Sequence, residues 1–221
     1  MLWFTSDLHF NHKNIIKYSR PKFNIYSKIE KNIDKMNQEI IDNINSCVKP
    51  EDELWILGDI SINAQSINYL RELQCNYIVV VSGNHDYVHP MHLPRNVEED
   101  FIKKEKRKEE INNTFLKRIE AYKEKTGVKE IHHNTLLTLS NNTTVRVNHF
   151  PYKDYGDARF PQWRPIDDGR WLVCGHVHQN WRQHGNQINV GIDAWGGMPV
   201  TEQQVINLTA SIKDLPAIRW K

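Results

Sequence analysis

The stretch Tyr77-Ile78-Val79-Val80-Val81-Ser82-Gly83-Asn84-His85-Asp86 joins an apolar run to three polar side chains. The run is rich in β-branched residues and predicts a buried strand, and residues at the carboxyl end of such a strand face the crevice where α/β sheets bind ligands. Asn84 offers a neutral oxygen to a cation, His85 can move a proton near neutral pH, and Asp86 can orient that imidazole. Taken alone, the tetrapeptide Gly83–Asp86 also fits an ordinary strand-to-loop turn.

Four other predicted strands end in the same kind of polar group. Each delivers a carboxylate or an imidazole to its carboxyl end: Met1–Thr5 before Asp7 and His9, Leu54–Leu57 before Asp59, Thr143–Asn148 before His149, and Arg170–Cys174 before His176 and His178. On an extended backbone, side chains two positions apart leave the same face, so each of the two closely spaced pairs points into one site. For the first pair, a strand that ends in a solvated Asp and a capping His is the alternative.

The spacing of apolar residues predicts an α/β fold. Over the first 81 residues, strands alternate with helices at Ser27–Val48 and Ile62–Leu73, as in a parallel sheet with crossover helices. The second half predicts a hairpin and two more strands, at Thr135–Ser140, Thr143–Asn148, Gln187–Ile192 and Val200–Leu208. A single domain over residues 1–221, with an insertion at about 90–130, is the economical description.

Two segments outside the strand ends carry further candidates. Glu98–Lys129 mixes charges with apolar residues at helical spacing, which predicts a solvated helix, with a cap over the cleft as the alternative. Residues 152–170 read as a long loop whose rings and cations suit a nucleobase and a phosphate, but equally suit a loop that packs on itself. Its candidate substrate contacts are Tyr152, Lys153, Arg159, Trp163 and Arg164. Arg20 is either a solvated surface charge or a phosphate contact.

Composition narrows the class of protein. A length of 221 residues suffices for one sizeable core, and a net charge of +2 gives no case for obligate nucleic-acid or membrane binding. Cys47, Cys75 and Cys174 are an odd number without paired spacing, which favours free thiols in a reducing compartment. No apolar run is as long as a membrane span, and no signal-peptide core precedes Asp7. We therefore expect a cytoplasmic protein of cellular or phage origin.

Eight residues at the strand ends are rich in oxygen and imidazole: Asp7, His9, Asp59, Asn84, His85, His149, His176 and His178. One metal ion cannot use them all. Two ions about 3.5–4 Å apart that share a carboxylate would use most of them and form a hydrolytic site. Because the set mixes oxygen with nitrogen and lacks thiolate, it favours Mn, Fe, Zn or Ni over Ca or Mg alone, and Mn is the ion we expect first.

The order and approximate spacing of these motifs resemble the calcineurin-like metallophosphoesterase superfamily. The resemblance rests on Asp7-Leu8-His9, Gly58-Asp59, Gly83–Asp86, His149 and Gly175–His178, and it runs from the first strand to about Trp195. The chain is similar to small single-domain members from bacteria and phages. The resemblance implies a four-layer α/β sandwich, in which two mixed β-sheets are flanked by helices.

The resemblance also implies roles for the matching residues. One metal would be held by Asp7, His9 and His178, the other by Asn84, His149 and His176, with Asp59 as the bridge. His85 would sit beside the scissile phosphate as a general acid or charge stabiliser, oriented by Asp86.

The implied activity is hydrolysis of phosphate esters by metal-activated hydroxide, with a small nucleotide or related ester as substrate. A nuclease or nucleic-acid end-processing phosphatase is the alternative, although such members usually carry additional DNA-binding domains. A non-catalytic scaffold of the same fold is a third reading, and the presence of His85 argues against it. The sequence leaves open the native metal, the preference for mono- or diesters and the oligomeric state.

Overall fold

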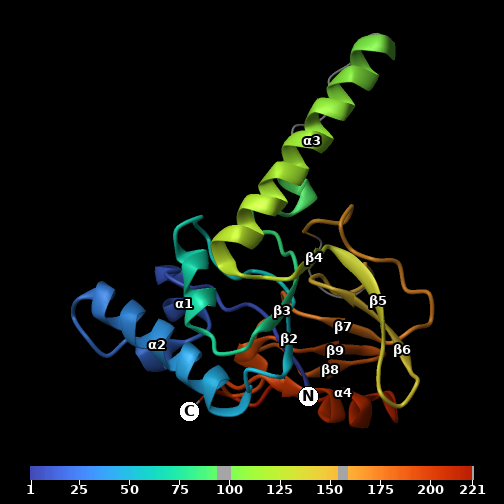
Figure 1. The fold of residues 1–221 in the computed structure, drawn as a ribbon. Helices are drawn as coiled ribbons and strands as arrows, with labels where there is room; N and C mark the ends of the chain where they lie inside the picture. Colours follow the sequence, from blue (N-terminus) through green and yellow to red (C-terminus); the bar gives the residue numbers. More distant parts are fainter. Residues whose placement is uncertain (94–100, 154–158, 221) are drawn as a thin grey trace.

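The computed structural model of this chain contains two five-stranded β-sheets packed against each other (Figure 1). It describes residues 1–93, 101–153 and 159–220, with the backbone alone for 101–106. The first sheet has the order β10-β1-β2-β3-β4, with strands Val200–Thr201, Leu2–Thr5, Glu53–Ile56, Tyr77–Val81 and Glu130–His132. The second has the order β5-β6-β7-β9-β8, with strands Asn134–Thr138, Thr144–Asn148, Leu172–Cys174, Gln187–Asn189 and Gln183–His184.

Both sheets are mixed. In the first, β1 to β4 are parallel and β10 is the antiparallel edge. In the second, β6, β7 and β9 are parallel, and the antiparallel strands β5 and β8 lie at the two edges. The parallel strands of each sheet therefore end at one common edge, where their polar residues emerge.

Strand β3 is buried on both faces, which explains its continuous apolar sequence. Ile78 and Val80 belong to one hydrophobic core, and Val79 and Val81 belong to the other. The second of these cores fills the space between the two sheets and includes Val147 and Val173 from β6 and β7. The two cores thus place β3 between a helical layer and the second sheet.

Helices cover the outer face of the first sheet. The helices α1 (Lys13–Tyr18) and α2 (Ile29–Cys47), the 3-10 helix η2 (Ser66–Glu72) and the end of α3 (Phe101–Thr126) contribute to the core on that side. On the far side of the second sheet, loop residues Tyr152 and Trp181 pack on Leu172 and Cys174. These layers confirm the predicted sandwich of two mixed sheets with helices.

The strands and the long helices lie close to where the sequence predicts them, with one clear exception. The predicted strand Val200–Leu208 is wrong beyond its first two residues, because β10 ends at Thr201 and α4 (Glu202–Thr209) begins. The reason is a capping box, in which the Thr201 side chain accepts from the N–H of Gln204 and the Gln204 side chain accepts from the N–H of Thr201. The predicted helix at Ile62–Leu73 is a shorter 3-10 helix, and α1, β4 and β8 were not predicted.

Helix α3 extends away from the two sheets (Figure 1). Its carboxyl-terminal part is anchored, since Tyr122 is fully buried and Arg118 Nη1 donates to Tyr87 O at 3.0 Å. Between residues 107 and 121 no side chain is buried, which fits the predicted solvated helix. Residues 94–100 of the predicted insertion lie outside the described residues.

Two predictions from composition are tested by the described residues. All three cysteines are free, as expected. Within the described ranges, every helix is too short or too polar to cross a lipid bilayer.

Candidate metal centre

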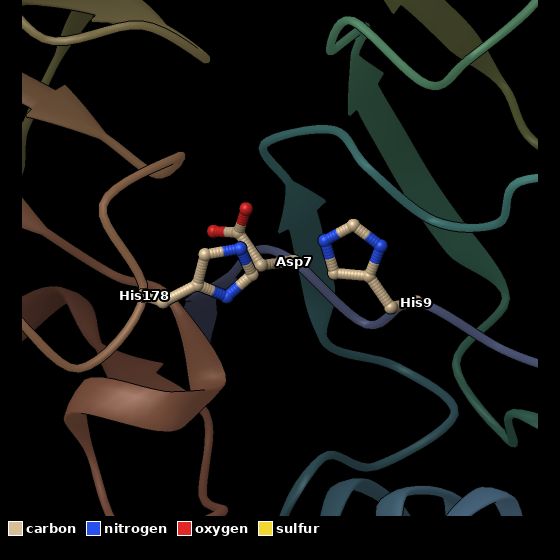
Figure 2. A group of neighbouring side chains, drawn as sticks. All are labelled: Asp7, His9 and His178. Atoms are coloured by element: carbon tan, nitrogen blue, oxygen red, sulfur yellow. The ribbon is translucent and has the colours of Figure 1, made fainter. Parts of the chain in front are cut away.

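The segments that follow β1, β2, β3, β6 and β7 bring their polar residues together. Three overlapping groups have candidate ligand atoms within 4.8 Å of one another: Asp7 with His9 and His178, His9 with Asp59 and His85, and Asp59 with His149 and His176. Figure 2 shows the first group, in which Asp7 and His9 come from the segment after β1 and His178 from the loop after β7. Residues from both sheets therefore build one centre.

Asp59 lies in the middle of this centre. Its Oδ2 atom is 3.5 Å from His149 Nε2, 3.7 Å from His9 Nε2 and 3.9 Å from His85 Nε2. Its Oδ1 atom accepts a hydrogen bond from the backbone N–H of His85 at 2.9 Å. One buried carboxylate thus faces imidazoles on two sides, which is the arrangement that two neighbouring cations can share.

Asn84 and His176 lie around His149 on one side of Asp59. The Oδ1 atom of Asn84 is 3.3 Å from His149 Nε2, and His176 Nδ1 is 3.2 Å from the same nitrogen. The other ring nitrogen of His149 donates to Leu57 O at 2.7 Å. This backbone bond fixes the ring so that Nε2 is the nitrogen that points into the centre.

The imidazoles on the other side are oriented in a similar way. His178 Nδ1 lies 2.8 Å from Asp193 Oδ2, and His9 Nδ1 lies 3.1 Å from His12 Nδ1. In each ring Nδ1 is engaged by a neighbour, which leaves Nε2 as the candidate ligand atom. Partners of this kind fix the tautomer and the orientation of histidines that bind metal.

The donor set fits a divalent transition metal. His9 Nε2 is buried and has no hydrogen-bond partner among the described residues, although Asp59 lies nearby. A buried polar atom without a partner costs about 1–3 kcal/mol, and a cation between the imidazole and the carboxylate would remove that cost. Carboxylate, amide and imidazole ligands together suit first-row divalent ions.

Burial controls the protonation of these groups. It lowers the pKa of His9 well below 6.5 and that of His176 to about 3, so both rings are neutral, as metal binding requires. Burial opposes the charge on Asp59, but His149 and other imidazoles hold the Asp59 pKa well below its usual range. Burial likewise opposes a proton on His149, yet Asp59 and Asp7 raise its pKa to about 9. The carboxylates therefore attract positive charge into the centre, which a bound cation would supply.

The backbone at the strand ends differs from the extended conformation that the sequence suggested. Five candidate ligands have a left-handed φ: Asp7 (59°), His9 (50°), Asp59 (52°), His176 (71°) and His178 (48°). Such conformations cost on the order of 1–3 kcal/mol each, and they concentrate at functional sites. His176 and His178 reach the same centre, as expected, but they belong to different ligand groups within it.

Two glycines allow the segments to approach closely. A Cβ atom on Gly83 would lie 2.4 Å from Asp59 Oδ1 and 2.8 Å from His149 Nδ1. On Gly175 it would lie 1.9 Å from Ser6 Oγ and 2.7 Å from Asp7 Oδ2. These distances explain why glycine precedes Asn84 and His176 in the sequence motifs.

Asp86 has a different position from the expected one. Its Oδ2 accepts from the backbone N–H groups of Asp59 and Gly83, both at 2.8 Å, and its Oδ1 accepts from Ile60 N–H at 3.0 Å. The expectation that Asp86 orients the His85 imidazole is therefore wrong. The side chain instead ties the segment after β3 to the segment after β2. Burial and the charge of Asp59 raise the pKa of Asp86 to about 7.

Arg20 was expected either as a solvated surface charge or as a phosphate contact, and its burial among protein partners fits neither. Its side chain is fully buried, and its Nε donates to Asp193 Oδ1 at 2.7 Å. Its Nη1 donates to Leu8 O at 2.7 Å, and its Nη2 donates to Asp7 O. Arg20 thus supports the centre from behind rather than facing a substrate, and its partner Asp193 is a residue that the sequence reasoning missed. The signal was present, since Asp193 follows the predicted strand Gln187–Ile192 just as Asp59 follows its strand.

The candidate substrate contacts of the loop after β6 fall into two classes. Tyr152 and Arg164 are buried, with the Tyr152 hydroxyl donating to Arg170 O at 2.9 Å and Arg164 Nε donating to Arg159 O at 2.9 Å. These contacts favour the alternative that the loop packs on itself. Lys153 and Arg159 are exposed, and Trp163 is half-buried. Residues 154–158 of this loop lie outside the described residues, and contact of Lys153, Arg159 and Trp163 with a substrate stays a prediction.

Comparisons with known proteins agree with the fold. A model of the family described as calcineurin-like phosphoesterase matches residues 1–180. The "Gene 66 protein" of Mycobacterium phage L5 is 27% identical over 227 residues, covering 96% of this chain and 95% of that protein. The "Gene 66 protein" of Mycobacterium phage D29 is 25% identical over 220 residues, covering 88% of each.

One solved structure and one archaeal protein add to this. The crystal structure of "the protein of unknown function AQ665" from Aquifex aeolicus has a TM-score of 0.61 at 22% identity, covering 94% of this chain and 98% of that one, and shows the shared fold. "Uncharacterized protein MJ1445" of Methanocaldococcus jannaschii is 38% identical over 88 residues, covering 38% of this chain and 46% of that protein. Because the family model spans most of the chain, the protein belongs to the calcineurin-like phosphoesterases and is a metal-dependent phosphoesterase.

Proposed function

We propose that this enzyme hydrolyses a small nucleotide or related phosphate ester at a two-metal centre, as a phosphodiesterase or phosphatase. The observation that carries the proposal is the position of Asp59, whose single carboxylate faces His9 on one side and His149 on the other. Two-metal hydrolases use a shared carboxylate of this kind between ions about 3.5–4 Å apart.

The residues divide into two ligand sets around that carboxylate. One set is Asp7, His9 and His178, and the other is Asn84, His149 and His176. When bound, two divalent ions would supply Lewis acidity and would activate a water molecule as the nucleophile for phosphate-ester hydrolysis. The mixture of oxygen and nitrogen donors favours Mn, with Fe, Zn or Ni as alternatives.

Of the three imidazoles that face Asp59, His85 is the most accessible to a substrate. Its side chain is 42% exposed, whereas those of His9 and His149 are 2% and 0% exposed. A proton held at its Nε2 would pass to the leaving oxygen, or the ring would stabilise charge on that oxygen. Arg159 and Arg164 lie close enough to His176 to lower its pKa, as burial also does, so they would provide positive charge near a phosphate bound beside that ring.

The proposal predicts different outcomes for His85→Ala and Asp59→Ala. The His85 variant should keep its metal and lose about 10²–10⁴-fold in turnover, because only proton transfer or charge stabilisation is removed. The Asp59 variant should lose both metal and turnover. Metal content by mass spectrometry and hydrolysis of bis-p-nitrophenyl phosphate, measured with Mn, Ni and Zn, test both.

His184→Ala is the matched control, because His184 is 41% exposed and lies on β8. It should retain metal and turnover. A His85 variant as fast as the unmodified enzyme would refute the proposed role. Parallel assays with p-nitrophenyl phosphate and with short single-stranded DNA distinguish a diesterase from a monoesterase and from a nuclease.

A further inference from the structure

A cavity of about 690 Å³ lies beside the candidate metal centre. One wall is the segment 90–93, which includes the 3-10 helix η3 (Pro90–His92), and the other wall is formed by Phe160, Gln162 and Trp163. Its volume falls within the range of about 300–1,000 Å³ that is typical of small-molecule sites. None of the described lining residues is Asp, Glu, Lys or Arg, so the cavity suits a neutral group rather than a second phosphate.

Both walls touch the same side of the metal centre. On the first wall, His92 Nε2 lies 2.9 Å from Asn84 O. On the second, the Phe160 ring lies 6.0 Å from the His176 ring, centroid to centroid. Asn84 and His176 belong to one proposed ligand set, so a phosphate held there would project one of its ester groups toward the cavity.

The aromatic wall is held in place before any ligand arrives. The Trp163 ring packs edge-on against buried His89 at 4.9 Å, and the Phe160 ring packs against Phe150 at 5.5 Å. Phe160 has a φ of 60°, which is a strained backbone conformation for a bulky residue. The backbone N–H of Trp163 donates to the backbone carbonyl of Phe160 at 3.0 Å. Fixed rings reduce the entropy lost when a flat group stacks on them.

We propose that this cavity is a base-binding subsite, which receives the nucleoside of a nucleotide ester while its phosphate lies at the metal centre. Stacking on Trp163 and Phe160 would hold the base, and the Gln162 amide and the exposed His92 ring would offer hydrogen bonds to its edge. This inference rests on the proposed function and narrows its substrate class to nucleoside-bearing esters.

Two diesters with one leaving group test the inference: thymidine 5′-(p-nitrophenyl phosphate) and methyl p-nitrophenyl phosphate. Both release p-nitrophenolate, so they differ only in the group that would enter the cavity. With saturating Mn, the unmodified enzyme should show a kcat/KM about tenfold or more higher for the thymidine ester, as base–aromatic stacking allows. Trp163→Ala should reduce that ratio to near one, mainly through KM, whereas Trp163→Phe should retain most of it.

Ile166→Ala is the control, because Ile166 lies on the same loop, is 74% exposed and does not line the cavity. It should leave the ratio unchanged. A second measurement needs no variant: thymidine 5′-monophosphate should inhibit hydrolysis of the methyl ester about tenfold more strongly than inorganic phosphate.

The outcomes separate the two proposals. If both esters are hydrolysed with equal kcat/KM, or if thymidine 5′-monophosphate inhibits no better than phosphate, the base-binding subsite is overturned while the phosphoesterase stands. A ratio that Trp163→Ala leaves intact in a folded variant also overturns it. If the metal-loaded enzyme hydrolyses only the monoester p-nitrophenyl phosphate, the subsite is tested by inhibition of that reaction, where thymidine 5′-monophosphate must again exceed inorganic phosphate. If it hydrolyses none of the three esters, it is the proposed function that fails.

Discussion

The His178 ring is oriented by the buried ion pair of Asp193 and Arg20, whereas the His149 ring is oriented by a backbone carbonyl. His178 Nδ1 lies 2.8 Å from Asp193 Oδ2, and Asp193 in turn accepts from Arg20 Nε at 2.7 Å. Burial opposes the charge on Asp193, but Arg20 and His178 hold the pKa of this carboxyl below its usual value. The same guanidinium binds the carbonyls of Asp7 and Leu8. Arg20 thus fixes the Asp193 carboxylate, which orients the candidate ligand His178, and also the backbone of the candidate ligand Asp7.

Asp193→Asn tests this chain of contacts. The substitution leaves Arg20 buried without an anionic partner, and breaking a buried ion pair costs about 3–5 kcal/mol. Loss of an outer partner of a metal-binding histidine typically weakens metal binding by about 10–100-fold. Urea unfolding measures the first effect, and equilibrium dialysis against Mn measures the second.

Asp168→Asn provides the comparison at the surface. Asp168 is 30% exposed and pairs with Arg146 at 2.6 Å. Exposed ion pairs contribute about 0–1 kcal/mol, so this variant should unfold near the unmodified midpoint and bind Mn normally. Equal effects from the two Asn variants would contradict a special role for Asp193.

The sequence predicted which residues come together as candidate ligands, but it did not predict all the contacts that hold those residues in place. Asp7, Asp59 and His149 could be named because a carboxylate or imidazole after an apolar run is visible in the chain. Arg20 could not be placed, since a loop arginine is normally solvated and its partner Asp193 lies 173 positions away. Asp86 was assigned to its neighbour His85, whereas tertiary contact gives its oxygens to backbone groups of Asp59, Gly83 and Ile60.

The segments that follow the strands keep a defined position because neighbouring segments remain hydrogen-bonded to each other beyond the strand ends. Asp7 N–H donates to Gly58 O at 3.0 Å, and His9 N–H donates to Asp59 O at 2.9 Å. Gly58, Gly83 and Gly175, at the start of the segments after β2, β3 and β7, leave room for the neighbouring side chains. Residues with a left-handed backbone and these glycines together allow the segments to turn toward one centre, which continued extended strands would not do.

Gly175→Ala should therefore disable the centre. The added methyl group would lie 1.9 Å from Ser6 Oγ, which is itself fixed by a 2.7 Å hydrogen bond to Leu57 O. Overpacking of this kind costs about 1–3 kcal/mol, and the displacement would move Asp7. Thermal unfolding without metal, followed by titration with Mn, should show a lowered midpoint and a loss of metal-induced stabilisation.

Gly169→Ala is the control for Gly175→Ala, because it adds a methyl group that strains the backbone without a steric clash. Gly169 has a φ of 80°, but no atom lies within 4 Å of its added Cβ. The substitution should cost about 1–2 kcal/mol from conformation alone and leave metal binding intact. If Gly175→Ala binds Mn as tightly as Gly169→Ala does, close packing at β7 is not needed for the site.

Element type was predictable wherever apolar periodicity was long and undivided, as in α2 and β3. Prediction failed at α4, where apolar Val200, Val205 and Leu208 suggested a strand. The local cap of Thr201 with Gln204 turns the chain into a helix, whose Val205 is then buried in the core between the sheets. Short apolar runs carry this ambiguity, and turn or cap residues decide it.

Across the whole molecule, the candidate ligands link the two sheets. Asp7, Asp59 and Asn84 follow strands of the first sheet, whereas His149, His176 and His178 follow strands of the second. Ions bound between them would crosslink the sandwich at one edge. The fold class was predictable because the motifs implied it, but the extension of α3 was not, since a mixed-charge helix carries no signal for its direction.

Metal binding should therefore stabilise the entire domain. At a free Mn concentration 100 times its Kd, the free energy of unfolding should rise by about 2.7 kcal/mol, since the ion binds the folded chain preferentially. Differential scanning calorimetry with Mn and with EDTA measures the shift. Asp59→Ala should show much less of it, and equal stabilisation of that variant would argue that Mn binds elsewhere.

The pairing of β1 has a consequence for biosynthesis. β1 lies between β2 and β10, so one of its edges has no partner until residues 200–201 have left the ribosome. The ligand groups span Asp7 to His178, so a nascent chain holds only fragments of either set for most of translation. Completion of both proposed ligand sets and closure of the first sheet therefore require nearly the whole chain, and a chain truncated before β7 would expose an open strand edge with neither set complete.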